Sequence, residues 1–351
     1  MADVSIIIPF RNAVRWLPSC LDSVLRQNLP VDCRIQLSAF DDSSEDASSA
    51  VCRSYESKFR EKLFDFVLGQ GTGNRLGVGG AKNRAVIQSN GRYLCFLDAD
   101  DEMGPGRVRA QLETAKRMGT NMFIIGTSFH RDPMESTPRY TRWANSLTHG
   151  ELYTQIYTSF GPTVLAPTWF CSRALFDSAG GFKETPKTGF PEDLDFFYKS
   201  LRLGALLDRV DDDSAVTLYR YHPECATFSV HEDTIRLIRV RELEERVIQN
   251  WSSFYIWNAG KGGRKFYKLL SEESKRKLVA FLDVDAKKIA QGYYEYADSP
   301  SKVKPRVPII SAEEARKPFV VCVKMDLTNG VLEDNLKRLG FVEGQDFYFA
   351  S

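Results

Sequence analysis

The sequence predicts an α/β fold, with a doubly wound, mostly parallel sheet followed by a smaller, Rossmann-like carboxy-terminal α/β domain. Three observations support this prediction. Short apolar runs alternate with segments of helical spacing over residues 1–130, acidic residues follow two of the apolar runs, and a second strand–glycine–helix unit begins near residue 254. Such an alternating series is typical of a parallel sheet covered by helices. The length of 351 residues fits two domains.

The first elements can be justified in order. Val4–Ile8 is a β-branched run ended by Pro9, as in a strand that is buried on both faces. Leucine and valine recur at helical spacing over 17–25, and Ser43–Asp46 opens another helix with residues that favour N-caps. The other elements expected here are strands at 35–39, 64–68, 93–97 and 122–126, and helices at 77–89 and from residue 105 onward.

The rest of the chain predicts a second domain. Residues 130–225 are less periodic and rich in aromatic residues, Pro and Gly, which suits substrate-binding loops. Residues 230–249 have the spacing of one long helix. We therefore expect a first domain over 1–229, a helical connector over 230–252 and a second domain over 253–351. Strands are expected at 254–257, 278–282 and 319–323, with an exposed loop at 298–306.

Composition limits the class of protein. The chain has 43% apolar and 26% charged residues, and a net charge of +1, so no global basic field indicates a nucleic-acid partner. The seven cysteines are scattered singly, which favours reduced thiols over a disulfide framework or a structural zinc site. The amino terminus lacks the pattern of a secretion signal, and no apolar run is long enough to cross a bilayer. We expect a cytoplasmic protein with no membrane partner and no obligate protein partner.

Acidic residues follow two of the predicted strands. Asp98–Asp101 comes directly after the strand at 93–97, and Asp41 and Asp42 follow the strand at 35–39. The carboxyl ends of parallel strands form the ligand crevice of an open α/β sheet. Carboxylates crowded there repel one another, and a divalent cation with diphosphate oxygens relieves the repulsion. The alternative is an acidic turn in contact with solvent.

Three further features could take part in chemistry. The glycine-rich segment Gly77–Ala85 starts a helix and carries Lys82, which suits phosphate binding, although a tight turn alone would also explain it. Asp193 precedes a helix and could deprotonate a hydroxyl group, or simply complement the helix dipole. His222 is one of four histidines, and a lone histidine is more often structural than a ligand.

Residues 3 to about 225 resemble the inverting glycosyltransferases of family 2, which have the GT-A fold. Six segments carry the resemblance in the family's order: Val4–Asn12, Phe40–Asp46, Gly77–Asn83, Phe96–Asp101, Pro191–Asp193 and Tyr219–His222. The chain departs from the usual family pattern at Ser43, where Gly is common, at Lys82, where Arg is commoner, and at Arg75, where Asn often stands.

The resemblance implies a role for each matching residue. The nucleotide sugar would be bound by Pro9, Phe10, Asn12, Asp42, Lys82, Asp98 and Ala99. Within that set, Asp42 would accept the uracil N3–H, and Asp98 would face the ribose or the metal. Asp100 would bind Mn²⁺ or Mg²⁺ with His222, and Asp193 would be the general base.

The whole chain also resembles animal family 2 enzymes that transfer galactose to queuosine in tRNA. Arg139–Trp143, Ile256–Lys261 and Glu343–Phe347 are among the segments that carry this likeness. It implies UDP-galactose as the donor and tRNA as the acceptor. Two alternatives stay open: transfer of another sugar, such as N-acetylglucosamine, to a glycan or protein, and a non-catalytic protein that binds sugar nucleotides or tRNA.

Charge and aromatic residues predict where the acceptor binds. Residues 251–310 hold 12 Lys and Arg against 6 Asp and Glu, a local net charge of +6 that could dock a polyanion. The acceptor-binding candidates are Arg264 and Lys265 in this segment, Glu192 beside the proposed base, and Trp169 and Phe170, which could stack on a base or belong to the core.

The second domain also contains a turn that resembles a dinucleotide-binding turn. Asn258–Arg264 follows a predicted strand, but Asn258 stands where the first glycine should be. Asp283 and Asp285 end the next strand, near the place of a ribose-binding acid. A degenerate turn of this kind could also serve only to keep the fold.

Overall fold

The computed structural model describes residues 1–158, 162–325 and 327–351. The chain divides into two compact units. The first comprises Met1–Leu152 and Pro162–His231, and the second comprises Tyr153–Gly161 and Glu232–Ser351. Helix α10 (Glu232–Arg246) groups with the second unit rather than forming a separate connector. Among the described residues, no helix is both long enough and apolar enough to cross a membrane.

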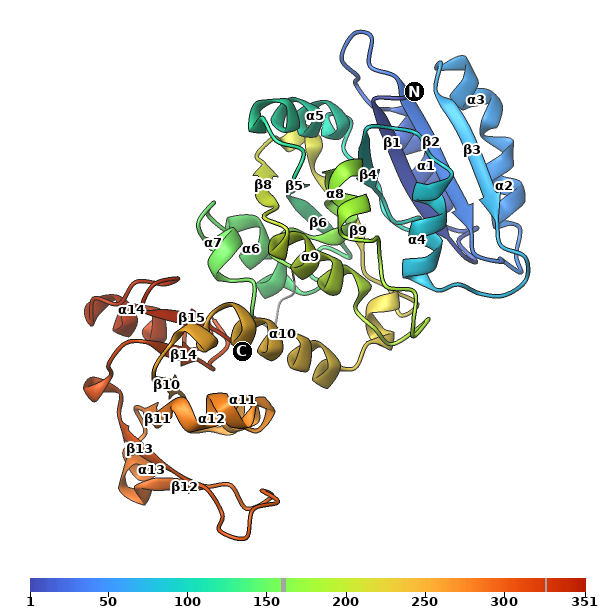
Figure 1. Ribbon diagram of the computed structural model, residues 1–351. Coiled ribbons are helices and arrows are strands. Elements are labelled where there is room, and N and C mark those ends of the chain that lie inside the picture. Colours follow the sequence, from blue (N-terminus) through green and yellow to red (C-terminus); the bar gives the residue numbers. More distant parts are fainter. Residues whose placement is uncertain (159–161, 326) are drawn as a thin grey trace. The chain divides into compact units, whose positions relative to one another are not determined.

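The first unit is built on a seven-stranded sheet with the order β3-β2-β1-β4-β7-β5-β8 (Figure 1). Every neighbouring pair is parallel except those made by β7, which runs antiparallel to β4 and β5. The mostly parallel α/β sheet predicted from the sequence is therefore confirmed. Its strands are β1 (Val4–Phe10), β2 (Ile35–Asp41), β3 (Asp65–Gln70), β4 (Tyr93–Phe96), β5 (Phe123–Thr127), β7 (Phe170–Ser172) and β8 (Leu206–Val210). A separate parallel pair is formed by β6 (Phe129–Asp132) and β9 (Thr217–Arg220).

Helices cover both faces of this sheet (Figure 1). α4 lies against β1 and β2 on one face, and side chains of α1, α2, α3 and α5 share a hydrophobic cluster on the other. The helices are α1 (Leu17–Leu25), α2 (Ser48–Ser54), α3 (Glu56–Glu61), α4 (Val78–Ile87), α5 (Arg107–Met118), α6 (Pro138–Ser146), α7 (Glu151–Thr154), α8 (Arg173–Ser178) and α9 (Glu192–Arg202).

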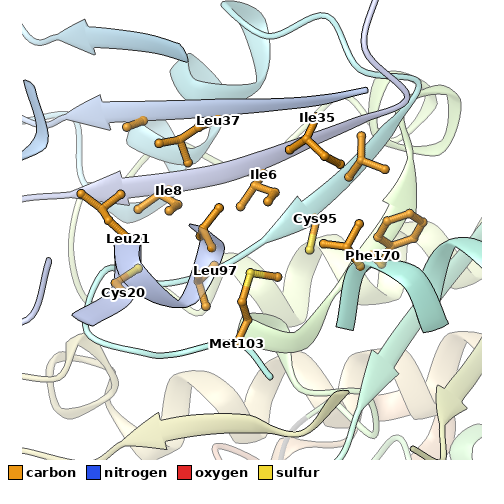
Figure 2. Packing of buried hydrophobic residues seen from close by; sticks show 14 of the residues in the cluster. Ile6, Ile8, Cys20, Leu21, Ile35, Leu37, Cys95, Leu97, Met103 and Phe170 are labelled. Carbon is orange, nitrogen blue, oxygen red and sulfur yellow. The ribbon is translucent and has the colours of Figure 1, made fainter. Parts of the chain in front are cut away.

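The central strand β1 explains why the core forms where it does. Ile6 is completely buried and lies between Leu37 of β2 and Cys95 of β4 in the strand register. Figure 2 shows Ile6 and Ile8 on the same face as Leu21 of α1. Because side chains alternate along a strand, Ser5 and Ile7 face α4 instead. Burial of each such aliphatic side chain stabilises the fold by about 1.5–3 kcal/mol.

The second unit has its own six-stranded sheet, with the order β12-β13-β11-β10-β14-β15. All pairs are parallel except β12 with β13, and the strands predicted at 254–257, 278–282 and 319–323 are present as β10, β11 and β14. The strands are β10 (Phe254–Trp257), β11 (Leu278–Asp283), β12 (Tyr293–Glu295), β13 (Arg306–Ser311), β14 (Phe319–Val321) and β15 (Phe347–Phe349). The helices besides α10 are α11 (Lys261–Leu269), α12 (Glu272–Lys277), α13 (Ala286–Gln291) and α14 (Val331–Arg338).

The aromatic pair proposed to stack on an acceptor base belongs to the core of the first unit. Trp169 is 1% exposed, its indole Nε1 donates to the backbone oxygen of Val164 at 2.7 Å, and its ring packs against Phe182. Phe170 is completely buried in β7 and stacks on Tyr93. Neither ring can reach a ligand without unfolding its surroundings. Their predicted role in acceptor binding is therefore withdrawn.

We expect Trp169→Ala to destabilise the protein by about 3–5 kcal/mol, the usual cost of removing a large buried aromatic side chain. Thermal and urea unfolding would measure the loss. Phe228→Ala is a matched control because the Phe228 side chain is 55% exposed, and its effect should be small. A Trp169→Ala protein of normal stability with a raised KM for the acceptor would contradict the core assignment.

Candidate active site

The carboxyl ends of β1, β2 and β4 bring the predicted nucleotide and metal residues to one edge of the sheet. Phe10 at the end of β1 lies opposite Asp41 at the end of β2. β4 pairs with β1 and ends two residues before Asp98. Because these strands are parallel, their carboxyl ends form the crevice in which α/β proteins bind their ligands.

The predicted metal residues Asp100 and His222 lie together. His222 Nε2 is 2.9 Å from Asp100 Oδ2, although 122 positions separate the two residues in sequence. The imidazole also stacks on Trp16, with ring centroids 5.3 Å apart. Both side chains keep some contact with solvent. An oxygen and a nitrogen donor at this spacing, both partly accessible, fit a divalent cation.

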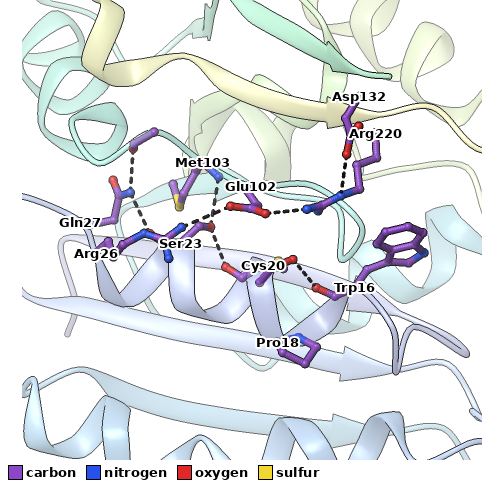
Figure 3. A network of polar contacts seen from close by, with 12 residues as sticks. Trp16, Pro18, Cys20, Ser23, Arg26, Gln27, Glu102, Met103, Asp132 and Arg220 are labelled. Atoms are coloured by element: carbon purple, nitrogen blue, oxygen red, sulfur yellow. Dashed lines mark hydrogen bonds and ion pairs between the residues drawn. The ribbon is translucent and has the colours of Figure 1, made fainter. Parts of the chain in front are cut away.

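Arg220, two residues before His222, contacts the acidic loop Asp98–Asp101 and the residue after it, and Figure 3 shows its ion pair with Glu102. Its guanidinium donates to the backbone oxygen of Asp100 at 2.7 Å and forms an ion pair with Glu102, which also pairs with Arg26. The backbone N–H of Arg220 donates to Asp101 Oδ1 at 2.9 Å. These contacts fix the end of β9, and with it the position of His222.

Sequence reasoning did not single out Trp16 or Arg220. An aromatic residue or an arginine on its own gives no sign of a partner more than a hundred residues away. Only the pairing of the chain around β9 brings them to the metal residues. The Tyr219–His222 segment, which carried part of the family resemblance, was the one available sign that Arg220 had a role.

Asp101 differs from its neighbours because it is completely buried. Burial, followed by the negative charges of Asp100 and Asp98, raises the pKa of Asp101 well above its usual value. This carboxyl group is consequently held neutral more readily than an ordinary aspartate. Its contact with the Arg220 backbone indicates a positioning role.

Lys82, predicted to bind phosphate, lies at the site in a buried ion-pair cluster. Its Nζ is 3.2 Å from Glu192 Oε1 and 4.0 Å from Asp98 Oδ1. Burial alone would lower the pKa of Lys82, but the charges of Asp98 and Glu192 outweigh it and the pKa is raised. Lys82 is therefore a fixed cation between the acidic loop and helix α9. Its contact with phosphate stays a prediction.

The candidate base Asp193 lies in the first turn of α9, beside that cluster. Its Oδ1 accepts the N–H of Leu194 at 2.7 Å. Burial, assisted by the negative charge of Glu192 and opposed by Lys82, raises the pKa of Asp193 to about 6. A carboxylate with such a pKa is a stronger base than an ordinary aspartate and is still ionised at neutral pH. These properties suit general-base chemistry.

The predicted uracil-binding residue Asp42 already has backbone partners. Its two carboxylate oxygens accept the N–H groups of Leu76 and Gly77, at 2.7 and 2.9 Å. Gly77 has φ of +85°, and a Cβ there would meet the backbone oxygen of Lys187 at 2.2 Å, so glycine is required. Asp42 thus anchors the loop that leads into α4. Its contact with uracil stays a prediction.

The other residues assigned to the nucleotide lie along the same edge. Asn12 has a left-handed backbone (φ 51°), and its side-chain oxygen accepts the N–H of Glu45, which ties the loop after β1 to the loop after β2. Phe10 and Ala99 are buried, and Pro9 is partly buried. Their contacts with a nucleotide stay predictions.

The glycine-rich turn of the second unit is held by its own side chains. Asp283 at the end of β11 accepts the N–H of Ala259 and pairs with Lys288. A Cβ at Gly263 would meet the backbone oxygen of Asn258 at 1.9 Å, so this glycine is needed for close packing. Because Asp283 is already engaged in these contacts, the turn is explained by the fold alone.

The predicted acceptor-binding cations lie on α11 of the second unit. The Arg264 guanidinium lies over the ring of Tyr294 and donates to the backbone oxygen of Ala259. Lys265 is 3.8 Å from Asp233. Several neighbouring lysines have acidic partners as well, among them Lys268, Lys275 and Lys277. The acidic partners of these three lysines are already counted in the local net charge of +6, and Asp233 is the one partner named here that lies outside residues 251–310. The docking role stays a prediction.

A mostly parallel sheet with carboxylates and a histidine gathered at its carboxyl edge has the architecture of an α/β protein that binds its ligand there. Residues 5–178 match the family described as glycosyl transferase family 2. This match covers just under half of the chain and agrees with the family resemblance that the sequence motifs carry. The GT-A type of fold predicted from the sequence is confirmed.

Individual relatives show the same class. The chain is 25% identical over 230 residues to the uncharacterized glycosyltransferase EpsJ of Bacillus subtilis, a match that covers 64% of this chain and 62% of that protein. It is 32% identical over 101 residues to poly(ribitol-phosphate) beta-glucosyltransferase of Bacillus spizizenii, covering 29% of this chain and 15% of that protein. Each relative is therefore matched over less than two thirds of its own length.

Solved structures share the fold. S. aureus TarS 1–349 in complex with UDP aligns with a TM-score of 0.52 at 19% identity, covering 78% of this chain and 70% of that one. A longer TarS structure aligns with a TM-score of 0.53 at 17% identity, covering 80% of this chain and 51% of that one.

Proposed function

We propose that the protein is an inverting, metal-dependent glycosyltransferase that transfers galactose from UDP-galactose to queuosine at the wobble position of a tRNA anticodon, in tRNA-Tyr. The observation that carries the reaction type is the juxtaposition of the Asp100–His222 pair with a basic carboxylate, Asp193, through the Lys82 cluster. The choice of galactose and queuosine rests on the resemblance of the chain's own segments to animal enzymes of that activity.

In this proposal Asp193, Asp100 and His222 have separate roles in the reaction. The Asp193 carboxylate accepts the proton of the acceptor hydroxyl as the hydroxyl oxygen attacks the anomeric carbon. The bond from that carbon to the UDP oxygen breaks on the opposite side, so an α-linked donor gives a β product. Asp100 and His222 would hold Mn²⁺ or Mg²⁺, which supplies charge stabilisation for the departing diphosphate.

Lys82 connects the acidic residues after β4 to the first turn of α9. It pairs with Glu192, the residue before the base, and with Asp98, two residues before the metal ligand. Its positive charge also opposes the rise in the pKa of Asp193, which keeps the base ionised at neutral pH. We assign Lys82 to the donor site and Glu192 to the acceptor side of the same cluster.

The name of one relative indicates an acceptor that is chemically similar to tRNA. One relative is named for action on poly(ribitol phosphate), which like tRNA is a phosphodiester chain bearing hydroxyl groups. Cations distant from the reaction centre would bind either polymer. Arg264 over Tyr294 and Lys265 on α11 are the candidates in this chain, since exposed ion pairs such as Lys265–Asp233 contribute little and can exchange for phosphate.

A crossed screen of donors and acceptors tests the proposal. UDP-galactose, UDP-glucose and UDP-N-acetylglucosamine would each be offered with queuosine-containing tRNA, unmodified tRNA and poly(ribitol phosphate), in Mn²⁺ or Mg²⁺. Nucleoside mass spectrometry should find a hexose on queuosine with UDP-galactose alone. Transfer to poly(ribitol phosphate), or from UDP-N-acetylglucosamine, would replace the proposed substrates but keep the reaction type.

The pH dependence of the reaction follows from Asp193. Its pKa is raised to about 6 by burial and by Glu192, and protonation removes the base. We therefore expect kcat/KM to be constant above pH 7 and to fall about tenfold per pH unit well below pH 6. Glu192→Gln removes a charge that raises this pKa, so the acid limb should move to lower pH. An acid limb that stays in place would contradict the assignment.

A further inference from the structure

A cysteine lies beside the Asp100–His222 pair and has no part in the proposed reaction. Ligand atoms of Asp100, His222 and Cys225 all lie within 4.8 Å of one another. In a tetrahedral zinc site with bonds of about 2.0–2.3 Å, ligand atoms are roughly 3–4 Å apart. The three donors thus approach the spacing of three protein ligands around one cation, with a fourth position left for water or phosphate.

The local chain explains why the sulfur is there. The N–H of Cys225 donates to the backbone oxygen of His222 at 3.0 Å, which closes a turn with Pro223 at its second position. The N–H of His222 donates back to Cys225 Sγ at 3.3 Å, and the thiol donates to the backbone oxygen of Arg220 at 3.8 Å. Because Arg220 is itself fixed to the acidic loop, the sulfur is held on the same side as the imidazole.

We propose that Cys225 is a third protein ligand, and that Asp100, His222 and Cys225 form a site for a thiophilic divalent cation of the Zn²⁺ class. A carboxylate and a thiolate together balance the charge of such a cation, and neutral imidazole completes a common zinc donor set. Binding displaces the thiol proton to solvent. This inference rests on the proposed function, in which the same aspartate and histidine serve Mn²⁺ or Mg²⁺.

Oxygen-preferring and thiophilic cations would then compete for Asp100 and His222. Mn²⁺ and Mg²⁺ prefer oxygen and would gain little from sulfur, whereas Zn²⁺, Cd²⁺ and Co²⁺ bind thiolate well. Zn²⁺ would therefore occupy Asp100 and His222 in the absence of donor and exclude Mn²⁺. The competing explanation is that Cys225 Sγ only accepts the His222 N–H and stabilises the turn.

Co²⁺ added to the full-length reduced protein, without any sugar nucleotide, distinguishes the two explanations. We expect a sulfur-to-cobalt charge-transfer band in the near ultraviolet, which a Cys225→Ser protein should lack. Serine keeps a hydrogen-bond acceptor for the His222 N–H, so the turn should survive, as circular dichroism would check. Cys33→Ser is the matched control, since Cys33 is partly exposed and precedes β2 at the opposite end of the sheet from the site.

Competition supplies a second readout. Mn²⁺ bound to the protein would be displaced by Zn²⁺ and detected as free Mn²⁺ by electron paramagnetic resonance. Cys225→Ser should raise the Zn²⁺ concentration needed to displace Mn²⁺ by more than about tenfold, because loss of a residue that only supports a metal ligand already costs about that much affinity. Cys33→Ser should leave this concentration unchanged. Absence of the cobalt band, or equal Zn²⁺ requirements in all three proteins, overturns the proposal. Because both measurements use metals alone, a failed donor screen would not affect either result.

Discussion

Replacing Asp100 with alanine should abolish turnover and sharply weaken binding of the UDP-sugar in the presence of metal. Asp100 is the carboxylate that lies 2.9 Å from His222, and no other acidic side chain of the described chain joins that histidine in the candidate metal group. Loss of the cation removes several kcal/mol of transition-state stabilisation. Since about 1.4 kcal/mol corresponds to a factor of ten, kcat/KM should fall by roughly 10³-fold or more.

Single-turnover kinetics and calorimetric titration of UDP, each with and without EDTA, would measure this effect. Asp65→Ala is a suitable control, because Asp65 is an exposed carboxylate at the amino end of β3, away from the site. EDTA should reduce the wild-type protein to the level of the Asp100→Ala variant. If the variant binds UDP normally and EDTA leaves activity intact, the metal assignment is wrong.

Asp193→Asn should retain the fold and the affinity for UDP while losing transfer by about 10²–10⁴-fold, the usual contribution of a general base. Asparagine preserves the size of the side chain and can still accept the Leu194 N–H, but it cannot take a proton from the acceptor. The expected signature is a lower kcat with little change in the KM for the donor.

Asp195→Asn provides the comparison within the same helix. Asp195 pairs with Lys199 one turn along α9 and so has a partner outside the acidic cluster. Its substitution should change the rate little. A large loss in Asp195→Asn with near-normal activity in Asp193→Asn would transfer the role of base to Asp195.

The local sequence pattern was sufficient to predict features that depend on residues close together in the chain. Val4–Ile8 could be identified as a strand buried on both faces because it is a β-branched run with a single polar residue, Ser5. Asp98–Asp101 could be placed at the ligand edge because parallel strands present their carboxyl ends together. In the second unit, β10, β11 and β14 were predicted from their apolar runs, whereas β12, β13 and β15 were not.

Features that depend on distant partners could not be predicted in this way. Trp169 and Phe170 have the composition of a stacking surface, and only the insertion of antiparallel β7 between β4 and β5 makes them core residues. Lys82 could not be seen as a counter-ion until Glu192, 110 positions away, was placed beside it. The pairing of Lys265 with Asp233, 32 positions earlier in the chain, could likewise not be seen in the sequence.

The crowding of acids around Lys82 has a consequence for the order of binding events. Asp98, Glu192 and Asp193 gather about one buried lysine, so negative charge exceeds positive charge there before any ligand arrives. A diphosphate approaching these residues without a cation meets electrostatic repulsion. A cation must therefore precede the sugar nucleotide or arrive attached to it, and steady-state kinetics with varied metal and donor should follow a compulsory sequence rather than a random one.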